Sequence, residues 1–187
     1  MEAKKQFKLS DERAFYLIKH FEKLDNQALH YFQQLGHSIE EVNQALSSIG
    51  SKFYASFCEN PFELIERIAL CSPFEVIQQS NANKAFRYKI PFDGGIGKNT
   101  IINIKTILHA VKIKKVIRNG FQVNVVERNS FDSTNELVVV CNPLNEVITI
   151  FPGVYAPAFP TQLVDENEVE ASELFWENHA FIIKSFL

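Results

Sequence analysis

The sequence has few cysteines and no pattern of metal ligands. Its three cysteines, Cys58, Cys71 and Cys141, are irregularly spaced, and none belongs to a CxxC pair. This spacing indicates neither a disulfide framework nor a zinc site, and it fits a reducing compartment. The five histidines never pair at HxH or HxxxH spacing. We therefore predict no metal and no cofactor.

Long apolar runs are also missing. No run approaches the roughly 20 residues that a membrane-spanning helix needs. The first residues, MEAKKQFKLSDER, are charged, and no apolar segment of a secretory signal follows them. We expect no membrane partner. The predicted location is the cytoplasm, or the outside of the cell after delivery as an effector without a Sec signal.

Two common catalytic signatures are absent. The sequence contains no GxSxG, so a hydrolase of the nucleophile-elbow type is not indicated. The glycine-rich loop at residues 93–99 departs twice from a P-loop: Phe92 stands five positions before Gly97, and Asn99 follows Lys98. The loop is more typical of a glycine turn between strands, although a backbone nest for a phosphate stays open.

The composition favours a buried core. Apolar residues make up 46% of the 187 residues, and 17 residues are Phe, so we expect one folded domain. Residues 10–80 contain several helix starts with a capping side chain, in two cases followed by Pro at the first helical position. These starts lie at Ser10, Asn26, Ser38, Asn60 and Ser72.

The second half of the chain has strand patterns. Residues 136–152 predict a hairpin whose turn is Asn142-Pro143-Leu144-Asn145. Residues 113–118 and 121–127 predict another, around Asn119-Gly120. In residues 86–90 aromatic and apolar side chains alternate with Arg87 and Lys89. Residues 100–111 suit a helix and a strand equally.

These patterns together predict an α+β fold. Residues 1–80 form an N-terminal bundle of short helices, which packs on a four- to five-stranded antiparallel sheet in residues 84–152. An acidic C-terminal helix in residues 165–187 closes the domain. Strands joined by short loops are expected to be antiparallel neighbours.

Charge is strongly segregated along the chain. The formal charge is +8 over residues 84–118 and −8 over residues 119–187. The basic segment is a candidate polyanion-binding surface, unless the acidic segment packs beside it and neutralises it. The candidate binding residues are Arg87, Lys89, Lys98, Lys105, Lys114 and Lys115.

A basic sheet combined with histidines on helices can cleave RNA without a metal. The chemistry needs a base for the 2′-hydroxyl proton, an acid for the leaving oxygen, and a cation for the phosphorane. His30 and His37 flank Gly36 near predicted helix ends and are the acid–base candidates.

Four short segments carry a resemblance to a known family: Ile96-Gly97-Lys98, QVNVVE (122–127), VVVCN (138–142) and EVITIFP (146–152). Across residues 30–152 the chain resembles the ribonuclease toxin modules of the barnase–EndoU–RelE type, near which the RNase A-like toxins of bacterial contact-dependent inhibition belong. The resemblance implies metal-independent RNA cleavage. It implies Gly97 as a turn glycine and the catalytic residues His30 or His37, Thr149, and a cation such as Lys112 or Arg118.

Two other functions stay open. Phe, Ile, Asn and Lys are abundant, as in AT-rich bacterial genomes, and a non-catalytic effector or adaptor that binds a protein or a polyanion also fits the chain. The helical half or the Pro-rich residues 154–160 would then be the docking surface. The remaining alternative is a small-molecule site in a cleft between the helices and the sheet.

Overall fold

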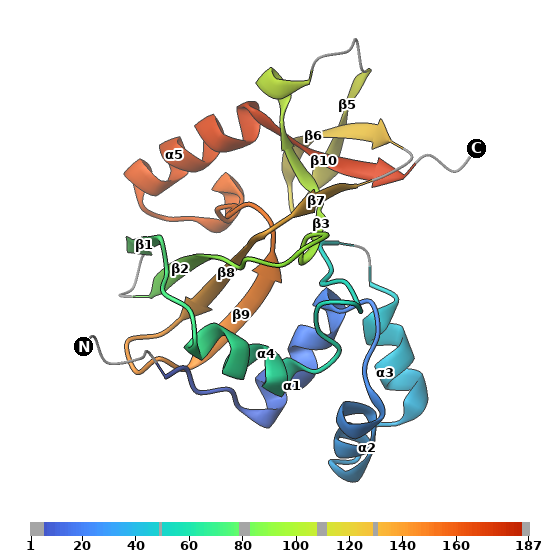
Figure 1. Cartoon of the computed structure of the whole chain (residues 1–187). Helices are drawn as coiled ribbons and strands as arrows, with labels where there is room; N and C mark the ends of the chain where they lie inside the picture. The colour runs from blue at the N-terminus through green and yellow to red at the C-terminus, as the bar shows by residue number, and fades with distance from the viewer. Residues whose placement is uncertain (1–5, 49, 79–82, 108–111, 129–130, 185–187) are drawn as a thin grey trace. The chain divides into compact units, whose positions relative to one another are not determined.

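The computed structural model describes residues 6–48, 50–78, 83–107, 112–128 and 131–184 (Figure 1). The α+β class predicted from the sequence is confirmed. Contacts divide the chain into two compact units. Unit 1 comprises Met1–Lys98 and Ser133–Val154, and unit 2 comprises Asn99–Asp132 and Tyr155–Leu187.

Unit 1 contains the predicted short helices. They are α1 (Asp11–Tyr16), which runs on into a 3-10 helix (Leu17–His20), α2 (Asn26–Gln34), α3 (Ile39–Leu46) and α4 (Pro61–Ala69). Ser10, Ser38 and Asn60 cap α1, α3 and α4 as predicted, whereas the cap of α2 is Asp25 rather than Asn26.

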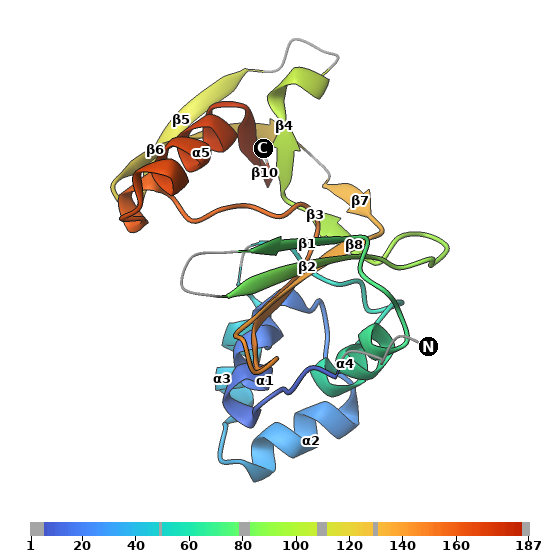
Figure 2. The ribbon, with the colours of Figure 1, turned by 90° about the vertical axis from the view of Figure 1, so that its left-hand side faces the viewer.

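The sheet of unit 1 has four antiparallel strands in the order β1-β2-β8-β9. They are β1 (Glu75–Gln78), β2 (Lys84–Lys89), β8 (Glu136–Cys141) and β9 (Val147–Pro152). Figures 1 and 2 show α1 to α4 on one side of this sheet. Phe86, Val139 and Ile150 point to that side and join Leu17, Phe32 and the other buried helix residues in one core. The predicted hairpin of residues 136–152 is therefore the centre and one edge of this sheet.

Unit 2 has its own four-stranded sheet in the order β4-β10-β6-β5. The strands are β4 (Ile101–Asn103), β10 (His179–Lys184), β6 (Phe121–Arg128) and β5 (Ile113–Arg118). The helix α5 (Glu166–Glu177) precedes β10, and its Trp176 ring stacks on Phe181 with centroids 5.0 Å apart. Asn119 and Gly120 have φ values of 48° and 73°, so the predicted β5–β6 turn is of type I′.

Three predictions about the elements were wrong. Residues 84–152 form strands of two four-stranded sheets rather than one, besides the short pair β3 (Gly97–Asn99) and β7 (Asp132–Thr134). Ser72 does not begin a helix, because Glu75–Gln78 pairs with β2 as a strand. The C-terminal helix ends at Glu177, and the chain then forms β10.

No short loop joins the strand β10 to either of its neighbours in the sheet. It pairs in parallel with β6 and antiparallel with β4. Its Ala180 and Ile182 are buried, at 0% and 3% exposure. This alternation is typical of a strand, whereas the sequence predicts that the C-terminal helix continues through these residues. The ambiguous residues 100–111 contain β4 and a 3-10 helix (Ile104–Thr106), while residues 108–111 lie outside the described residues.

Candidate functional site

The strand β5 is the most exposed regular element of unit 2. All six of its residues are exposed, and it lies at the edge of its sheet, with β6 as its only strand neighbour among the described residues. Three of its side chains are apolar: Ile113, Val116 and Ile117 are 40%, 37% and 76% exposed. An edge strand with free backbone groups and exposed apolar side chains is a surface that can pair with another chain.

Cations surround these apolar side chains. Lys114 donates to Glu127 Oε1 at 2.8 Å, and the Arg118 guanidinium lies 4.8 Å from the ring centre of Phe181. Within the described part of the chain, Lys112 and Lys115 are exposed and form no salt bridge. Lys115 of the strand and Lys112, which directly precedes it, are therefore available to a partner.

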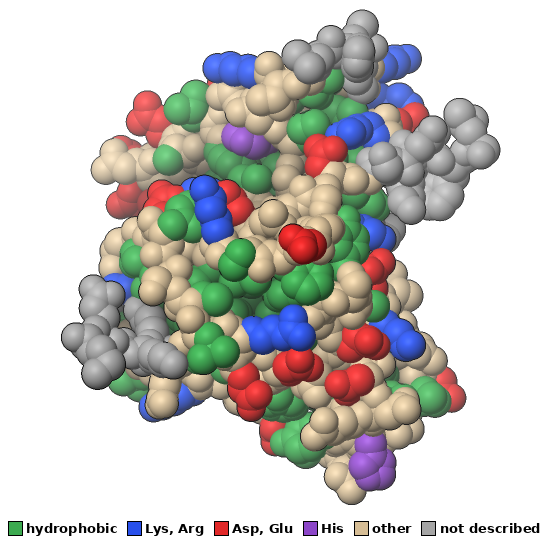
Figure 3. Space-filling view, in the orientation of Figure 1, with side chains coloured by type: hydrophobic (Ala, Val, Ile, Leu, Met, Phe, Trp, Pro, Cys, Tyr) green, Lys and Arg blue, Asp and Glu red, His purple; other side chains and the backbone are tan. Residues whose placement is uncertain are grey.

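The acidic helix of the same unit does not neutralise β5. No salt bridge joins a carboxylate of α5 to a cation of β5 in the described residues, where the ion pairs of unit 2 are Lys114–Glu127 and Arg128–Asp132. Figure 3 shows red side chains gathered over α5 and blue ones toward β5. The polarity predicted from the sequence is thus present within one unit.

The predicted basic residues of unit 1 are paired instead. Arg87 contacts Glu75 and Glu136, and Lys89 lies 4.0 Å from Glu136. Lys98 lies 3.1 Å from Glu22. In the described residues, the members of the predicted polyanion-binding set that form no ion pair are Lys105 and Lys115, both in unit 2, as is Lys112 of the predicted catalytic set.

The predicted catalytic histidines have separate surroundings in unit 1. His30 is exposed on α2. The ring of His37 stacks on Phe15 with centroids 3.7 Å apart, and its Nδ1 lies 3.2 Å from Glu41 Oε2. This hydrogen bond lowers the pKa of Glu41. His37 is thus engaged with its own neighbours.

Thr149 belongs to the other side of the same sheet. It pairs with Val140, whereas its neighbour Ile150 points into the core beneath the helices. Side chains alternate between the faces of a strand, so Thr149 does not share a face with that core. No hydrogen bond or ion pair joins Thr149 to His30 or His37 in the described residues. The predicted cations Lys112 and Arg118 belong to unit 2.

Gly97 is not a turn glycine. It is the first residue of β3, and a side chain there would meet the Lys52 carbonyl oxygen at 2.6 Å and Pro152 Cβ at 2.8 Å. The Lys98 amide donates to that carbonyl at 2.9 Å. Glycine is therefore required at position 97, because the chain packs closely there against Lys52 and Pro152.

Two histidines that the sequence did not single out have defined roles. The Nδ1 of His20 lies 3.0 Å from the carbonyl oxygen of Ser51, and burial lowers the pKa of this imidazole from 6.5 to about 4. In unit 2, His179 Nδ1 lies 2.6 Å from the Phe175 carbonyl oxygen. A pocket of about 380 Å³ is lined by His179 and Lys105 together. No local motif marks either residue, because their partners become neighbours only on folding.

The described residues contain no group of three or more His, Cys, Asp or Glu side chains arranged to hold a metal ion. In that same part of the chain no helix has the length and apolar character to cross a membrane.

Comparison with known proteins gives little further information. No family model and no curated protein matches the chain. A crystal structure of a conserved hypothetical protein from Toxoplasma gondii ME49 is similar with a TM-score of 0.44 and 13% identity, over 67% of this chain and 87% of that one. This similarity is too distant to indicate a function. The resemblance to ribonuclease toxin modules stays a prediction.

Proposed function

We propose that this protein is a non-catalytic binding protein, and that the outer edge of β5 receives an acidic, extended segment of a partner protein. The observation that carries the proposal is that all six residues of β5 are exposed and that the strand lies at the edge of its sheet. A peptide that adds as a strand would satisfy the free backbone groups of this edge.

The apolar side chains favour a protein over RNA. Ile117 is 76% exposed and Ile113 is 40% exposed. Alternate side chains of an added peptide strand would cover them and remove apolar surface from water. A phosphate backbone would contact the lysines but would leave these side chains in water.

Charge selects among peptides. Lys112 and Lys115 carry no ion pair in the described residues, and lysines at an edge also oppose pairing between two copies of the same strand. Carboxylates on the partner would complement them and would increase the association rate at low salt. The preferred partner is thus acidic and has apolar side chains at alternate positions.

The hairpin fixes which backbone groups face the partner. In a two-residue type I′ hairpin the flanking pair, here Arg118 and Phe121, exchanges hydrogen bonds. The N–H groups of Lys115 and Ile117 therefore point away from β6, and those of Val116 and Arg118 point toward it. Strand addition would use Lys115 and Ile117.

Fluorescence anisotropy with a labelled, alternating Glu-Val decapeptide tests this proposal. Ile117→Pro removes an outward N–H without removing a bond to β6, and should weaken binding by at least about tenfold. Ile117→Thr keeps the N–H and should bind more tightly than the proline variant. Thermal melting establishes that both variants are folded.

Charge is tested separately. The double variant Lys112→Glu/Lys115→Glu should weaken binding and reduce its salt dependence. The control Lys23→Glu, at an exposed lysine of unit 1, should change neither. Equal affinity of the proline and threonine variants would exclude strand addition. Tighter binding of an oligouridylate with a steep salt dependence would identify RNA as the partner.

One observation favours RNA cleavage as a second candidate function: His179 and Lys105 line the same pocket of the unit that contains β5. In this reading His179 Nε2 is the acid–base group, since Nδ1 is held by the Phe175 carbonyl. Incubation with tRNA in EDTA should then give cleavage that His179→Ala abolishes and His30→Ala retains. If neither the wild type nor His30→Ala cleaves tRNA, RNA cleavage is excluded as a function.

A further inference from the structure

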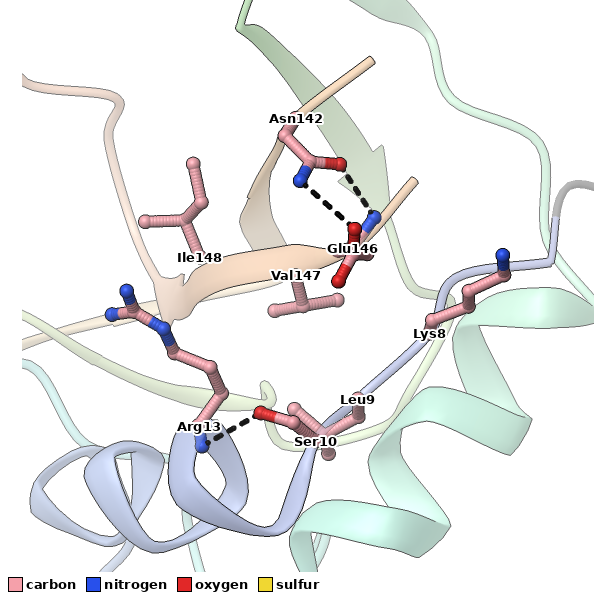
Figure 4. Close-up of a pocket in the computed structure, with 8 residues that line it drawn as sticks. All are labelled: Lys8, Leu9, Ser10, Arg13, Asn142, Glu146, Val147 and Ile148. Atoms are coloured by element: carbon pink, nitrogen blue, oxygen red, sulfur yellow. Dashed lines mark hydrogen bonds between the residues drawn. The ribbon is translucent and has the colours of Figure 1, made fainter. Parts of the chain in front are cut away.

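A pocket of about 370 Å³ lies in unit 1 beside the start of β9 (Figure 4). Its walls come from the segment that leads into α1, from the first turns of α1, and from the turn between β8 and β9. The lining residues are Lys8, Leu9, Ser10, Arg13, Asn142, Glu146, Val147 and Ile148.

Hydrogen bonds hold the frame of this pocket. The Lys8 amide donates to the Asn145 carbonyl at 2.9 Å, and the Val147 amide donates to the Lys8 carbonyl at 2.8 Å. Asn142 Oδ1 accepts from the amides of Leu144 and Glu146, both at 3.0 Å. The pocket is therefore formed before any ligand enters, which lowers the entropic cost of binding.

Opposite charges line this pocket without pairing. Arg13 and Glu146 lie on opposite sides of it, and the Lys8 ammonium group points away from both (Figure 4). In the described residues neither Arg13 nor Glu146 forms a salt bridge. Glu146 Oε1 accepts from Asn142 Nδ2 at 3.3 Å, which orients the carboxylate while its second oxygen keeps its acceptor capacity.

Ser10 adds a hydroxyl donor to the lining. Its Oγ accepts from the Arg13 amide at 3.1 Å, so the hydroxyl proton is free to be donated to a ligand. Leu9, Val147 and Ile148 supply the apolar part of the lining. Besides Lys8, the pocket thus combines the Arg13 guanidinium, the Glu146 carboxylate, the Ser10 hydroxyl and an aliphatic wall.

We propose that this pocket binds a small zwitterion of the free amino acid class. The ligand's carboxylate would lie against Arg13 and Ser10, and its ammonium group against Glu146. A simple anion would also face Glu146, and a simple cation would also face Arg13, so each would meet repulsion from one side. An aliphatic side chain would contact the apolar wall.

Isothermal titration of the full-length protein with L-leucine tests the proposal. N-acetyl-L-leucine lacks the ammonium charge and L-leucinamide lacks the carboxylate, so each should bind at least about tenfold more weakly than L-leucine. Inorganic phosphate serves as the probe for a plain anion site.

Variants assign each charge to its partner. Arg13→Gln should bind L-leucine and L-leucinamide equally, because the carboxylate no longer has a partner. Glu146→Gln should bind L-leucine and N-acetyl-L-leucine equally. Glu12→Gln, at an exposed carboxylate of the same helix, is the matched control and should retain wild-type binding.

Two results would overturn the proposal. One is the absence of L-leucine binding up to about 10 mM. The other is phosphate binding that exceeds L-leucine binding and is lost in Arg13→Gln, which would identify an anion site.

Discussion

His20 makes the stability of this protein depend on pH in a way that can be calculated. Its ring is partly buried at the end of the 3-10 helix, and Nδ1 donates to the Ser51 carbonyl at 3.0 Å. Burial is the main reason why the pKa falls from 6.5 to about 4, and the neighbouring Lys19 and Lys52 lower it further. The folded protein therefore holds His20 neutral.

The sign of the effect follows from linkage. In the unfolded chain His20 binds a proton below about pH 6.5, whereas the folded protein resists protonation until about pH 4. The contribution of His20 is complete above pH 6.5 and is lost as the pH falls toward 4. A pKa difference of this size corresponds to about 3 kcal/mol in total.

Urea unfolding of the wild type and of His20→Gln at pH 7.5 and pH 4.5 isolates this contribution. The stability difference between the two proteins should shift by about 2.5 kcal/mol against the wild type on acidification. Other titrating groups affect both proteins and cancel. His30→Gln, at an exposed histidine, is the control and should change stability by less than about 0.5 kcal/mol at either pH. A wild-type-to-His20→Gln difference that is the same at both pH values would refute the reasoning.

Three further substitutions test the packing. Gly97→Ala should cost about 1–3 kcal/mol, because its Cβ would lie 2.6 Å from the Lys52 carbonyl oxygen; an unchanged urea midpoint would contradict the close approach. Lys52→Met should cost about 2 kcal/mol, because the ammonium donates to the carbonyls of Lys19 and Leu46, both at 2.8 Å; calorimetry would show an unaltered melting temperature if these bonds did not matter. Gly120→Val should cost about 1 kcal/mol or more, because φ is 73° there; equal stability in chemical denaturation would mean that the turn tolerates a side chain.

Local signals allowed much of the fold to be predicted. Ser10, Ser38 and Asn60 cap helices through their own side chains, and Asn119-Gly120 fixes a hairpin through its backbone angles. In each case the interaction that defines the structure is made within a few residues. Such features are visible in the sequence because no distant partner is needed.

Distant pairing explains the errors. Ser72 is followed by Pro73 and Glu75, the same spacing of Pro and Glu that follows Asn60 at the start of α4. Glu75 nevertheless pairs with Arg87 on the neighbouring strand. The strand β10 forms because Ala180 pairs with Ile102 of β4 and Ile182 pairs with Val126 of β6. Both partners are far from β10 in the sequence. Local propensity gives no information on such neighbours.

The candidate site was predictable only in part. The basic character of β5 follows from the sequence, because Lys114, Lys115 and Arg118 all lie within its six residues. The pairing of Arg87 with Glu136 and of Lys98 with Glu22 depends on the fold, and it removes these cations from the predicted surface. These ion pairs could not be predicted from the sequence, because Glu136 and Glu22 are far from Arg87 and Lys98 along the chain.

The most direct test of the proposed function is amide hydrogen exchange, followed by NMR, with and without the Glu-Val decapeptide. Strand addition predicts slower exchange at the outward amides of Lys115 and Ile117, with little change at the inward amides of Val116 and Arg118. Unchanged exchange along β5 in the presence of saturating peptide would contradict the proposal that this edge is the binding surface.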